Sequence, residues 1–166
     1  MPLCVWKATG EGDTVVGKRD GQEAVVLSLL EKKTENYLAI RIPGKTSEAV
    51  MQAMLALRAE YGERFSQVFK TITVDNGSEF ADFAQVERWG SQVFFAHPYT
   101  SWERAQNERH NGLLRAFVPK GVSIEQFTDE DILAAADELN GRPRKKLGYR
   151  TPEELFDAFL DSVYAA

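Results

Sequence analysis

Cysteine and histidine are scarce in this sequence of 166 residues, which has one cysteine and two histidines. The single cysteine, Cys4, excludes an internal disulfide and a zinc site made of several thiolates. The two histidines, His97 and His110, have no spacing partners that would complete a histidine-based site. Any metal ion held by this chain should therefore have oxygen ligands.

Long apolar runs, internal repeats and low-complexity tracts are also missing. No stretch approaches the roughly 18 residues of a membrane span, and residues 1–7 are too short for the apolar core of a signal peptide. We therefore expect a cytoplasmic protein with no membrane partner. A length of 166 residues fits one domain with a sizeable core. We expect residues 1–9 to be a disordered lead-in and residues 10–166 to form that domain.

Positive charge is in deficit overall but is concentrated in one segment. The net charge of −5 argues against contact with DNA, because an acidic surface repels phosphates. Residues 140–150 nevertheless contain several Lys and Arg residues and no acid. Such a patch can bind DNA while the rest of the surface stays acidic, although a solvated turn between two helices is an equal alternative. On the first interpretation the DNA contacts come from Arg142, Arg144, Lys145 and Lys146.

Hydrophobic periodicity predicts an α/β domain. Three strands with short connections form an antiparallel meander, and helices and strands then alternate. This order predicts a mixed five-stranded sheet with helices on both faces. The expected strands are 11–17, 24–30, 37–42, 68–74 and 92–96. The expected helices are 46–62 capped by Thr46 or Ser47, 78–89 capped by Ser78, one around Glu108, 129–139 capped by Thr128, and 151–160 with a Thr151/Glu154 capping box.

Three carboxylates occupy positions at which such a fold can bring them together. Asp13 lies in the first strand, and Asp75 ends the fourth strand at an Asn76-Gly77 turn. Glu108 lies on a polar helical face. Three carboxylates without soft ligands suit Mg²⁺ or Mn²⁺, and a pair of such ions supports phosphoryl transfer. The alternative for any one of the 25 acids is an ordinary solvated surface position.

The expected helix around Glu108 has two distinct sides. Residues on the side of Glu108 follow helical spacing and are polar. For Asn111 and Arg115 we regard contact with DNA and plain surface exposure as equally good interpretations, and Arg104 is a further predicted DNA contact. The polar side comprises Arg104, Glu108, Asn111 and Arg115, and the opposite side comprises His110, Leu113, Leu114 and Phe117.

Four blocks of the sequence together resemble the integrase-type catalytic core of bacterial DDE transposases, most closely the insertion-sequence-thirty family. The resemblance covers about residues 10–160. It implies an RNase H-like fold in which Asp13, Asp75 and Glu108 match the three metal-binding acids. It further implies Mg²⁺-dependent cleavage at transposon ends by water, followed by attack of the freed 3′-hydroxyl on target DNA, generally within a multimeric synapse. The blocks are 11–17 (EGDTVVG), 73–80 (TVDNGSEF), 107–115 (NERHNGLLR) and 139–152 (LNGRPRKKLGYRTP).

The sequence departs from the family pattern at a few positions. Gly10 stands where a tryptophan is usual, and Ala105 and Gln106 replace a glycine and a small polar residue. Family members also carry an amino-terminal helix-turn-helix region, for which the residues before Asp13 are too few, so we expect a catalytic domain on its own.

Two residues beside Asp75 and two competing functions complete the predictions. Asn76 is expected to shape the turn, with a phosphate contact as the alternative. Glu79 is expected to be a favourable first-turn charge rather than a metal ligand. The competing functions are a catalytically silent fragment that binds DNA or dimerises, and a different RNase H-like nuclease that cleaves without joining strands.

Overall fold

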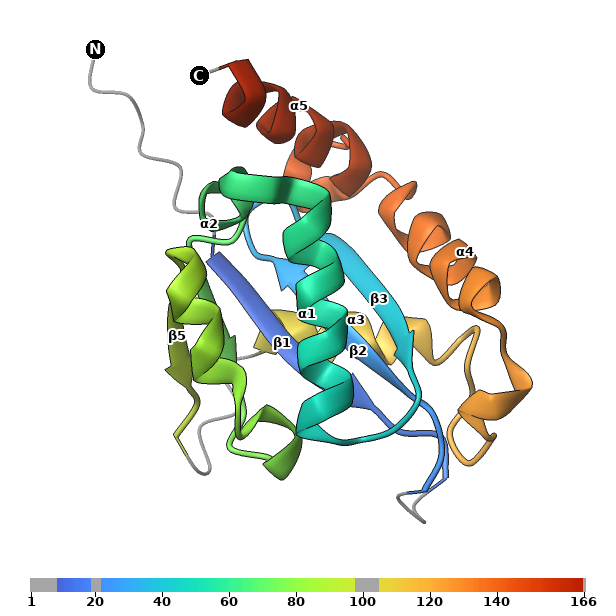
Figure 1. The fold of residues 1–166 in the computed structure, drawn as a ribbon. Coiled ribbons are helices and arrows are strands. Elements are labelled where there is room, and N and C mark those ends of the chain that lie inside the picture. Colours follow the sequence, from blue (N-terminus) through green and yellow to red (C-terminus); the bar gives the residue numbers. More distant parts are fainter. Residues whose placement is uncertain (1–8, 19–21, 98–104, 166) are drawn as a thin grey trace.

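The computed structural model describes residues 9–18, 22–97 and 105–165, and a sheet of five strands forms its centre (Figure 1). The strand order is β3-β2-β1-β4-β5, in which β1, β2 and β3 are antiparallel neighbours and β4 and β5 continue the sheet parallel to β1. The predicted meander and mixed sheet are therefore confirmed. The strands are β1 (Thr9–Val15), β2 (Val25–Glu31), β3 (Asn36–Ile42), β4 (Thr71–Val74) and β5 (Gln92–Phe95).

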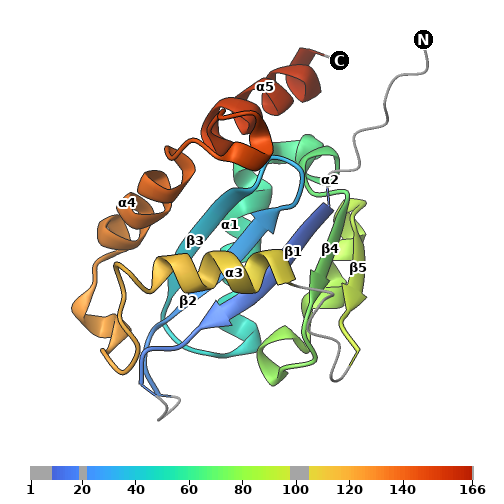
Figure 2. The same cartoon turned by 180° about the vertical axis from the view of Figure 1, so that it is seen from behind.

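Helices cover both faces of the sheet, as predicted. Helix α1 lies across one face, and α3 crosses the opposite face over β1 and β2 (Figures 1 and 2). None of the helices in the described ranges is long and apolar enough to span a membrane. The α-helices are α1 (Ser47–Tyr61), α2 (Phe65–Val68), α3 (Ala105–Leu114), α4 (Asp129–Asn140) and α5 (Pro152–Ala165).

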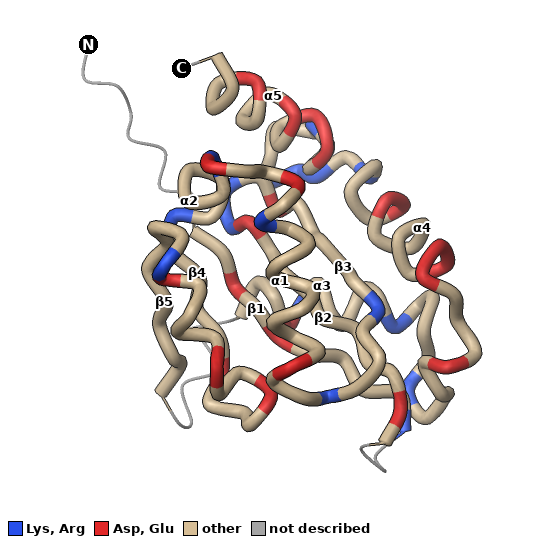
Figure 3. Tube along the Cα trace, in the orientation of Figure 1, with Lys and Arg blue, Asp and Glu red and all other residues tan. Residues whose placement is uncertain are grey.

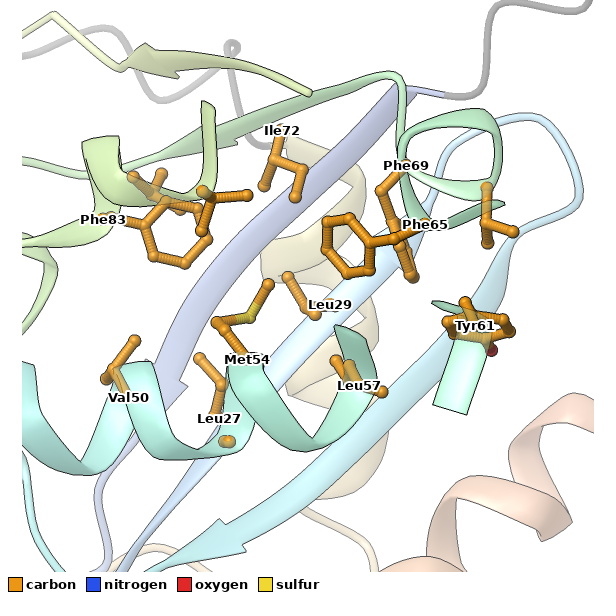
Figure 4. Close-up of a cluster of buried hydrophobic side chains, with 14 of the residues drawn as sticks. Leu27, Leu29, Val50, Met54, Leu57, Tyr61, Phe65, Phe69, Ile72 and Phe83 are labelled. Atoms are coloured by element: carbon orange, nitrogen blue, oxygen red, sulfur yellow. The ribbon is translucent and has the colours of Figure 1, made fainter. Parts of the chain in front are cut away.

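The core cluster under α1 consists of apolar side chains. Leu27 and Leu29 of β2 point to this face and meet Met54 of α1, with Phe65 and Ile72 completing the contact (Figure 4). Alternate residues of a strand point to opposite faces, so the continuous apolar run of β2 can serve both layers at once. Burial of these large side chains accounts for the stability of this half of the domain.

The face under α3 has its own apolar cluster, which α4 closes. Val26 and Leu30 of β2 pack here against Leu114 of α3 and Leu139 of α4. Between Val26 and Leu30 the same face of β2 carries Ser28, which is fully buried. A polar side chain in the centre of an apolar face needs hydrogen-bond partners, and those partners come from α3 and β1.

Three predicted helix starts are confirmed by their caps. The Thr46 hydroxyl accepts a hydrogen bond from the Ala49 amide at 3.1 Å. Thr128 and Asp131 form a reciprocal capping box at the start of α4. The Thr151 hydroxyl accepts from the Glu154 amide at 3.1 Å, and α5 continues beyond the expected end at residue 160.

Two predicted elements are wrong in part. Residue 68 ends helix α2, so the fourth strand begins only at Thr71. The predicted α-helix 78–89 is instead two 3₁₀ segments, Ser78–Phe80 and Phe83–Trp89, and the Ser78 side chain caps neither. The buried residues Phe80, Phe83 and Val86 recur every third position, and a helix with three residues per turn brings them all to the core side.

The start of the chain is described only from Thr9, which already belongs to β1 and pairs with Thr71. The rest of the expected lead-in lies outside the described residues.

Candidate active site

Asp13 and Asp75 belong to neighbouring parallel strands. The register pairs Gly10 with Ile72 and Glu11 with Thr73, and continuing it by two residues sets Asp13 across from Asp75. Asp13 lies within β1, whereas Asp75 follows the last residue of β4. The condition on which the predicted carboxylate pair depended, adjacency of the first and fourth strands, is therefore met.

Helix α3 is attached to β1 by a buried polar network centred on Asn107. The Asn107 side chain is 0% exposed and the Glu11 side chain is 2% exposed, so neither can rely on water. The Asn107 backbone amide donates to Glu11 Oε2 at 2.7 Å, and its Nδ2 donates to the Glu11 carbonyl at 3.1 Å and to Ser28 Oγ at 3.3 Å. These bonds fix the beginning of α3 over β1 and hence the position of Glu108, the next residue.

A second series of hydrogen bonds runs from the core to Asp13. The buried Tyr37 hydroxyl donates to Asn111 Oδ1 at 2.8 Å. That bond turns the Asn111 amide so that Nδ2 donates to Asp13 Oδ2 at 3.4 Å and to Asn107 Oδ1 at 3.2 Å. Burial raises the pKa of Tyr37 well above its ordinary value, so the hydroxyl keeps its proton and remains a donor.

Asp13 and Glu108 line one open hollow of about 280 Å³ on the α3 side of the sheet. Two cations, Arg115 and Lys120, border the same space. The structure thus brings two of the three predicted carboxylates together beside positive charge. The hollow is lined by Asp13, Thr14, Val15, Glu108, Asn111, Gly112, Arg115 and Lys120.

Asp75 does not line that hollow, because its turn holds its carboxylate. Asp75 Oδ1 accepts the Gly77 amide at 2.8 Å. A Cβ atom added at Gly77 would lie 2.9 Å from Asp75 Oδ1 and would also collide with the carboxylate of Glu79, so a larger residue there would displace both carboxylates. In the part of the chain that the structure describes, no three Asp, Glu, His or Cys side chains are close enough to hold one ion.

Glu79 is a site residue that the sequence interpretation missed. It lies in the first turn of the 3₁₀ segment Ser78–Phe80, as predicted, and it is also 3% exposed and accepts the Thr14 hydroxyl at 3.0 Å. Lys45 Nζ lies 3.8 Å from the same oxygen, Glu79 Oε1, and compensates part of the charge. Because Thr14 follows Asp13 in β1, Glu79 connects the Asp75 turn to the strand that carries Asp13.

The predicted DNA contacts near Glu108 have defined places. The Asn76 Nδ2 donates to the Ala96 carbonyl at 2.7 Å, which ties the turn to the end of β5. Arg115 lies just after α3 and donates through Nη2 to the Val16 carbonyl at 3.0 Å. Asn111 is engaged with Asp13 and Tyr37 as described above. Arg104 lies outside the described residues.

The predicted basic segment forms the link between α4 and α5, where Figure 3 shows Lys and Arg gathered. Arg142 lies 3.8 Å from Glu138 and over the Phe117 ring. Arg144 donates to the Leu139 carbonyl at 2.9 Å, and Lys146 lies 3.6 Å from Glu35. Lys145 is exposed beside them.

Comparison with known proteins finds transposases that are similar in sequence to this chain. It is 36% identical over 152 residues to the transposase for insertion sequence element IS4351 of Bacteroides fragilis, covering 91% of this chain and 45% of that protein. It is 33% identical over 148 residues to the transposase InsI for element IS30A of Escherichia coli K12, covering 89% and 37%. This chain is a homologue of the insertion-sequence transposases, IS30 among them. No protein-family model matches it.

The transposase homologue has the fold of an integrase catalytic core. The catalytic core domain of bovine immunodeficiency virus (BIV) integrase superposes with a TM-score of 0.66 at 19% identity, covering 95% of this chain and 99% of that one. A chain of the simian T-cell lymphotropic virus intasome superposes with a TM-score of 0.71 at 18% identity, covering 90% and 54%. The predicted RNase H-like fold is confirmed. The chain spans less than half the length of the transposases described above.

Proposed function

We propose that this chain is the catalytic core of a transposase, which cleaves DNA at transposon ends with the help of a divalent metal ion and transfers the cut strand to target DNA. The observation that carries the proposal is the hollow shared by Asp13 and Glu108, with Asp75 at the end of the adjacent strand, in a homologue of transposases. Because the proposed substrate is DNA, we also propose a cytoplasmic location.

Asp13, Asp75 and Glu108 are the residues that would hold Mg²⁺ or Mn²⁺, as two ions. The donor chemistry fits, because the described residues of the hollow include the carboxylates of Asp13 and Glu108 and neither histidine nor cysteine. Such ions supply activation of water or a 3′-hydroxyl and neutralisation of the leaving oxygen.

The other residues around the hollow have supporting roles in this proposal. Asn111 orients the Asp13 carboxylate through its hydrogen bond. Arg115 and Lys120 offer positive charge to the scissile phosphate and its neighbours. Asn76, Arg104, Arg142, Arg144, Lys145 and Lys146 would contact DNA outside the hollow, and a homo-oligomer would hold the two transposon ends.

Nicking of supercoiled plasmid DNA in Mg²⁺ or Mn²⁺ tests the chemistry. We expect cleavage by the wild-type chain, its loss with EDTA, and a loss of roughly a thousandfold or more in Asp75→Asn and Glu108→Gln, because each removes several kcal/mol of charge stabilisation. Glu153→Gln on the exposed side of α5 is the matched control and should nick normally. Equal nicking by all four proteins would refute the assignment.

The separation of Asp75 from the hollow favours a second candidate, a transposon-derived fragment that binds DNA without chemistry. Under that hypothesis the wild-type chain binds DNA but never nicks it in either metal. A nuclease of the same fold would nick DNA but would not join an added 3′-hydroxyl end to a target plasmid.

A further inference from the structure

A second pocket, of about 340 Å³, lies on another side of α3. It lies between the β2–β3 turn and residues 141–151, which connect α4 to α5 and which we call the basic link. It shares no lining residue with the hollow of Asp13 and Glu108. We call it the Glu35 pocket. It is lined by Glu35, Arg109, His110, Leu113, Pro143, Arg144, Lys145 and Lys146.

The Glu35 pocket is assembled around a buried carboxylate. Glu35 is 3% exposed and has a left-handed backbone with φ of 59°, a conformation that is uncommon for residues other than glycine. Its carboxylate forms ion pairs with Arg109 of α3 and with Lys146, whose Nζ lies 3.6 Å away. One acid from the β2–β3 turn therefore gathers cations from two segments that are distant in sequence.

Positive charge in the Glu35 pocket exceeds what Glu35 can neutralise. Four cationic side chains line it, and Glu35 is the one acid among the described residues of the lining. The side chains of Arg109 and Lys146 remain 55% and 60% exposed while they pair with Glu35, so they can still reach a ligand. The neighbouring acids Glu138 and Glu154 are paired with Arg142 and Arg150 instead.

The basic link is also held in one shape. The Arg144 Nη2 donates to the last turn of α4, and the Arg144 backbone amide donates to the Arg150 carbonyl at 3.0 Å. A 3₁₀ turn, Lys145–Leu147, lies between these two anchors. Cations held on a fixed backbone lose less conformational entropy on binding an anion than cations on a free loop.

We propose that the Glu35 pocket binds a backbone phosphate of the DNA strand that enters the active site. This inference rests on the proposed function, since it takes DNA as the ligand. Arg109 directly follows Glu108 in α3, so one helix carries a carboxylate of the hollow and a cation of the pocket. A phosphate bound at Arg109, Lys145 and Lys146 would fix the strand relative to α3 without contacting the reacting group, which makes these three positioning residues.

Fluorescence anisotropy with a labelled DNA duplex in metal-free buffer, over 50 to 200 mM KCl, tests the proposal. Lys145→Gln/Lys146→Gln should weaken binding by about tenfold and lower the slope of log K against log salt by about one to two, because phosphate contacts are lost. Arg109→Gln alone should weaken it several-fold. The matched control, Lys70→Gln/Arg88→Gln, removes the same charge from exposed positions outside the pocket lining and should change affinity less than twofold.

The outcomes separate this inference from the proposed function. Equal effects of the two double substitutions on duplex affinity, or no effect of either, would overturn the proposal that the Glu35 pocket binds a phosphate. DNA binding and nicking by the wild-type chain would be unaffected by that result. Inorganic phosphate that raises the melting temperature of the wild type but not of Lys145→Gln/Lys146→Gln, with duplex affinity unchanged, would mean a small-anion site and would also overturn it. Loss of nicking in Asp75→Asn with normal duplex binding tests the chemistry alone.

Discussion

The two faces of the sheet are built differently. Under α1 the core cluster is apolar, from Leu27 and Leu29 to Phe65. Under α3 an apolar cluster is joined at β1 and β2 by a buried network of Ser28 and Asn107 with Glu11. Apolar packing tolerates small shifts, whereas buried hydrogen bonds require fixed distances and directions. The comparison suggests that the α1 face supplies most of the stability and the α3 face sets the geometry of the site.

Truncation of a core side chain on the α1 face should have the largest effect on stability. Phe65 is fully buried and contacts Phe69 and Trp89 through their rings. Phe65→Ala should lower the free energy of unfolding by about 3–5 kcal/mol, because it removes apolar contacts and leaves a cavity. Urea denaturation followed by circular dichroism measures this change. A loss below about 1 kcal/mol would contradict the role given to this face.

Removal of the Asn107 side-chain amide should lower stability less than Phe65→Ala does, but it should disturb the active site more. Asn107→Ala removes the side-chain hydrogen bonds to buried partners on β1 and β2, which should cost about 1–3 kcal/mol. Plasmid nicking at a temperature where the variant is fully folded should fall by at least tenfold, since Glu108 loses its support.

Ser91→Ala is the matched control for Asn107→Ala. Ser91 is also buried, and its hydroxyl donates to the Phe69 carbonyl at 2.6 Å, a contact that does not involve α3. It should cost about 1 kcal/mol and leave nicking unchanged. If both variants lost nicking only in proportion to their loss of stability, the claim that the α3 face sets the geometry of the active site would be refuted.

Tyr37→Phe should have a smaller effect of the same kind. The change removes one hydroxyl, which donates to Asn111, and retains the buried ring. We expect a loss of about 1 kcal/mol in stability. The metal concentration for half-maximal nicking should rise several-fold, because Asn111 no longer fixes Asp13. An unchanged metal dependence would show that Tyr37 acts through packing alone.

The smallest effect should come from His110, which stacks on Tyr37. Burial lowers the pKa of His110, and its Nδ1 lies 2.8 Å from the Gln106 carbonyl, so the neutral ring donates from Nδ1. The unfolded chain therefore binds more protons than the folded chain as the pH falls from about 6.5 to the lower folded pKa. Stability should fall through this window and then level off.

Urea denaturation at several pH values between 5 and 7.5 measures the contribution of His110. The pH dependence near 6.5 should be weaker in His110→Phe, which keeps a ring against Tyr37 and cannot titrate. The same pH dependence in both proteins would show that other groups are responsible.

Much of the fold could be predicted because it depends on local signals. The apolar run of β2, the caps at Thr46 and Thr128 and the Thr151/Glu154 box are each visible within a few residues of sequence. The error at 78–89 was also local, since the spacing of Phe80, Phe83 and Val86 indicates a 3₁₀ helix and was interpreted as α-helical.

The polar network of the site could not be predicted in the same way. Glu11 and Asn107 lie 96 positions apart, and neither is distinguishable by type from the many solvated polar residues of the chain. Glu79 follows a turn and resembles a surface charge in the sequence, which does not show that Thr14 of β1 lies beside it. The sequence indicates which acids to examine, whereas only the tertiary structure reveals which groups hold them.

Binding of Mn²⁺ measured by electron paramagnetic resonance, without DNA, tests most directly whether the three acids form one site. We predict that the wild-type chain binds Mn²⁺ and that Asp13→Asn, Asp75→Asn and Glu108→Gln each weaken binding by at least tenfold, whereas Glu153→Gln does not. Wild-type affinity in Asp75→Asn would contradict the account, because Asp75 would then belong to its turn and not to the metal site.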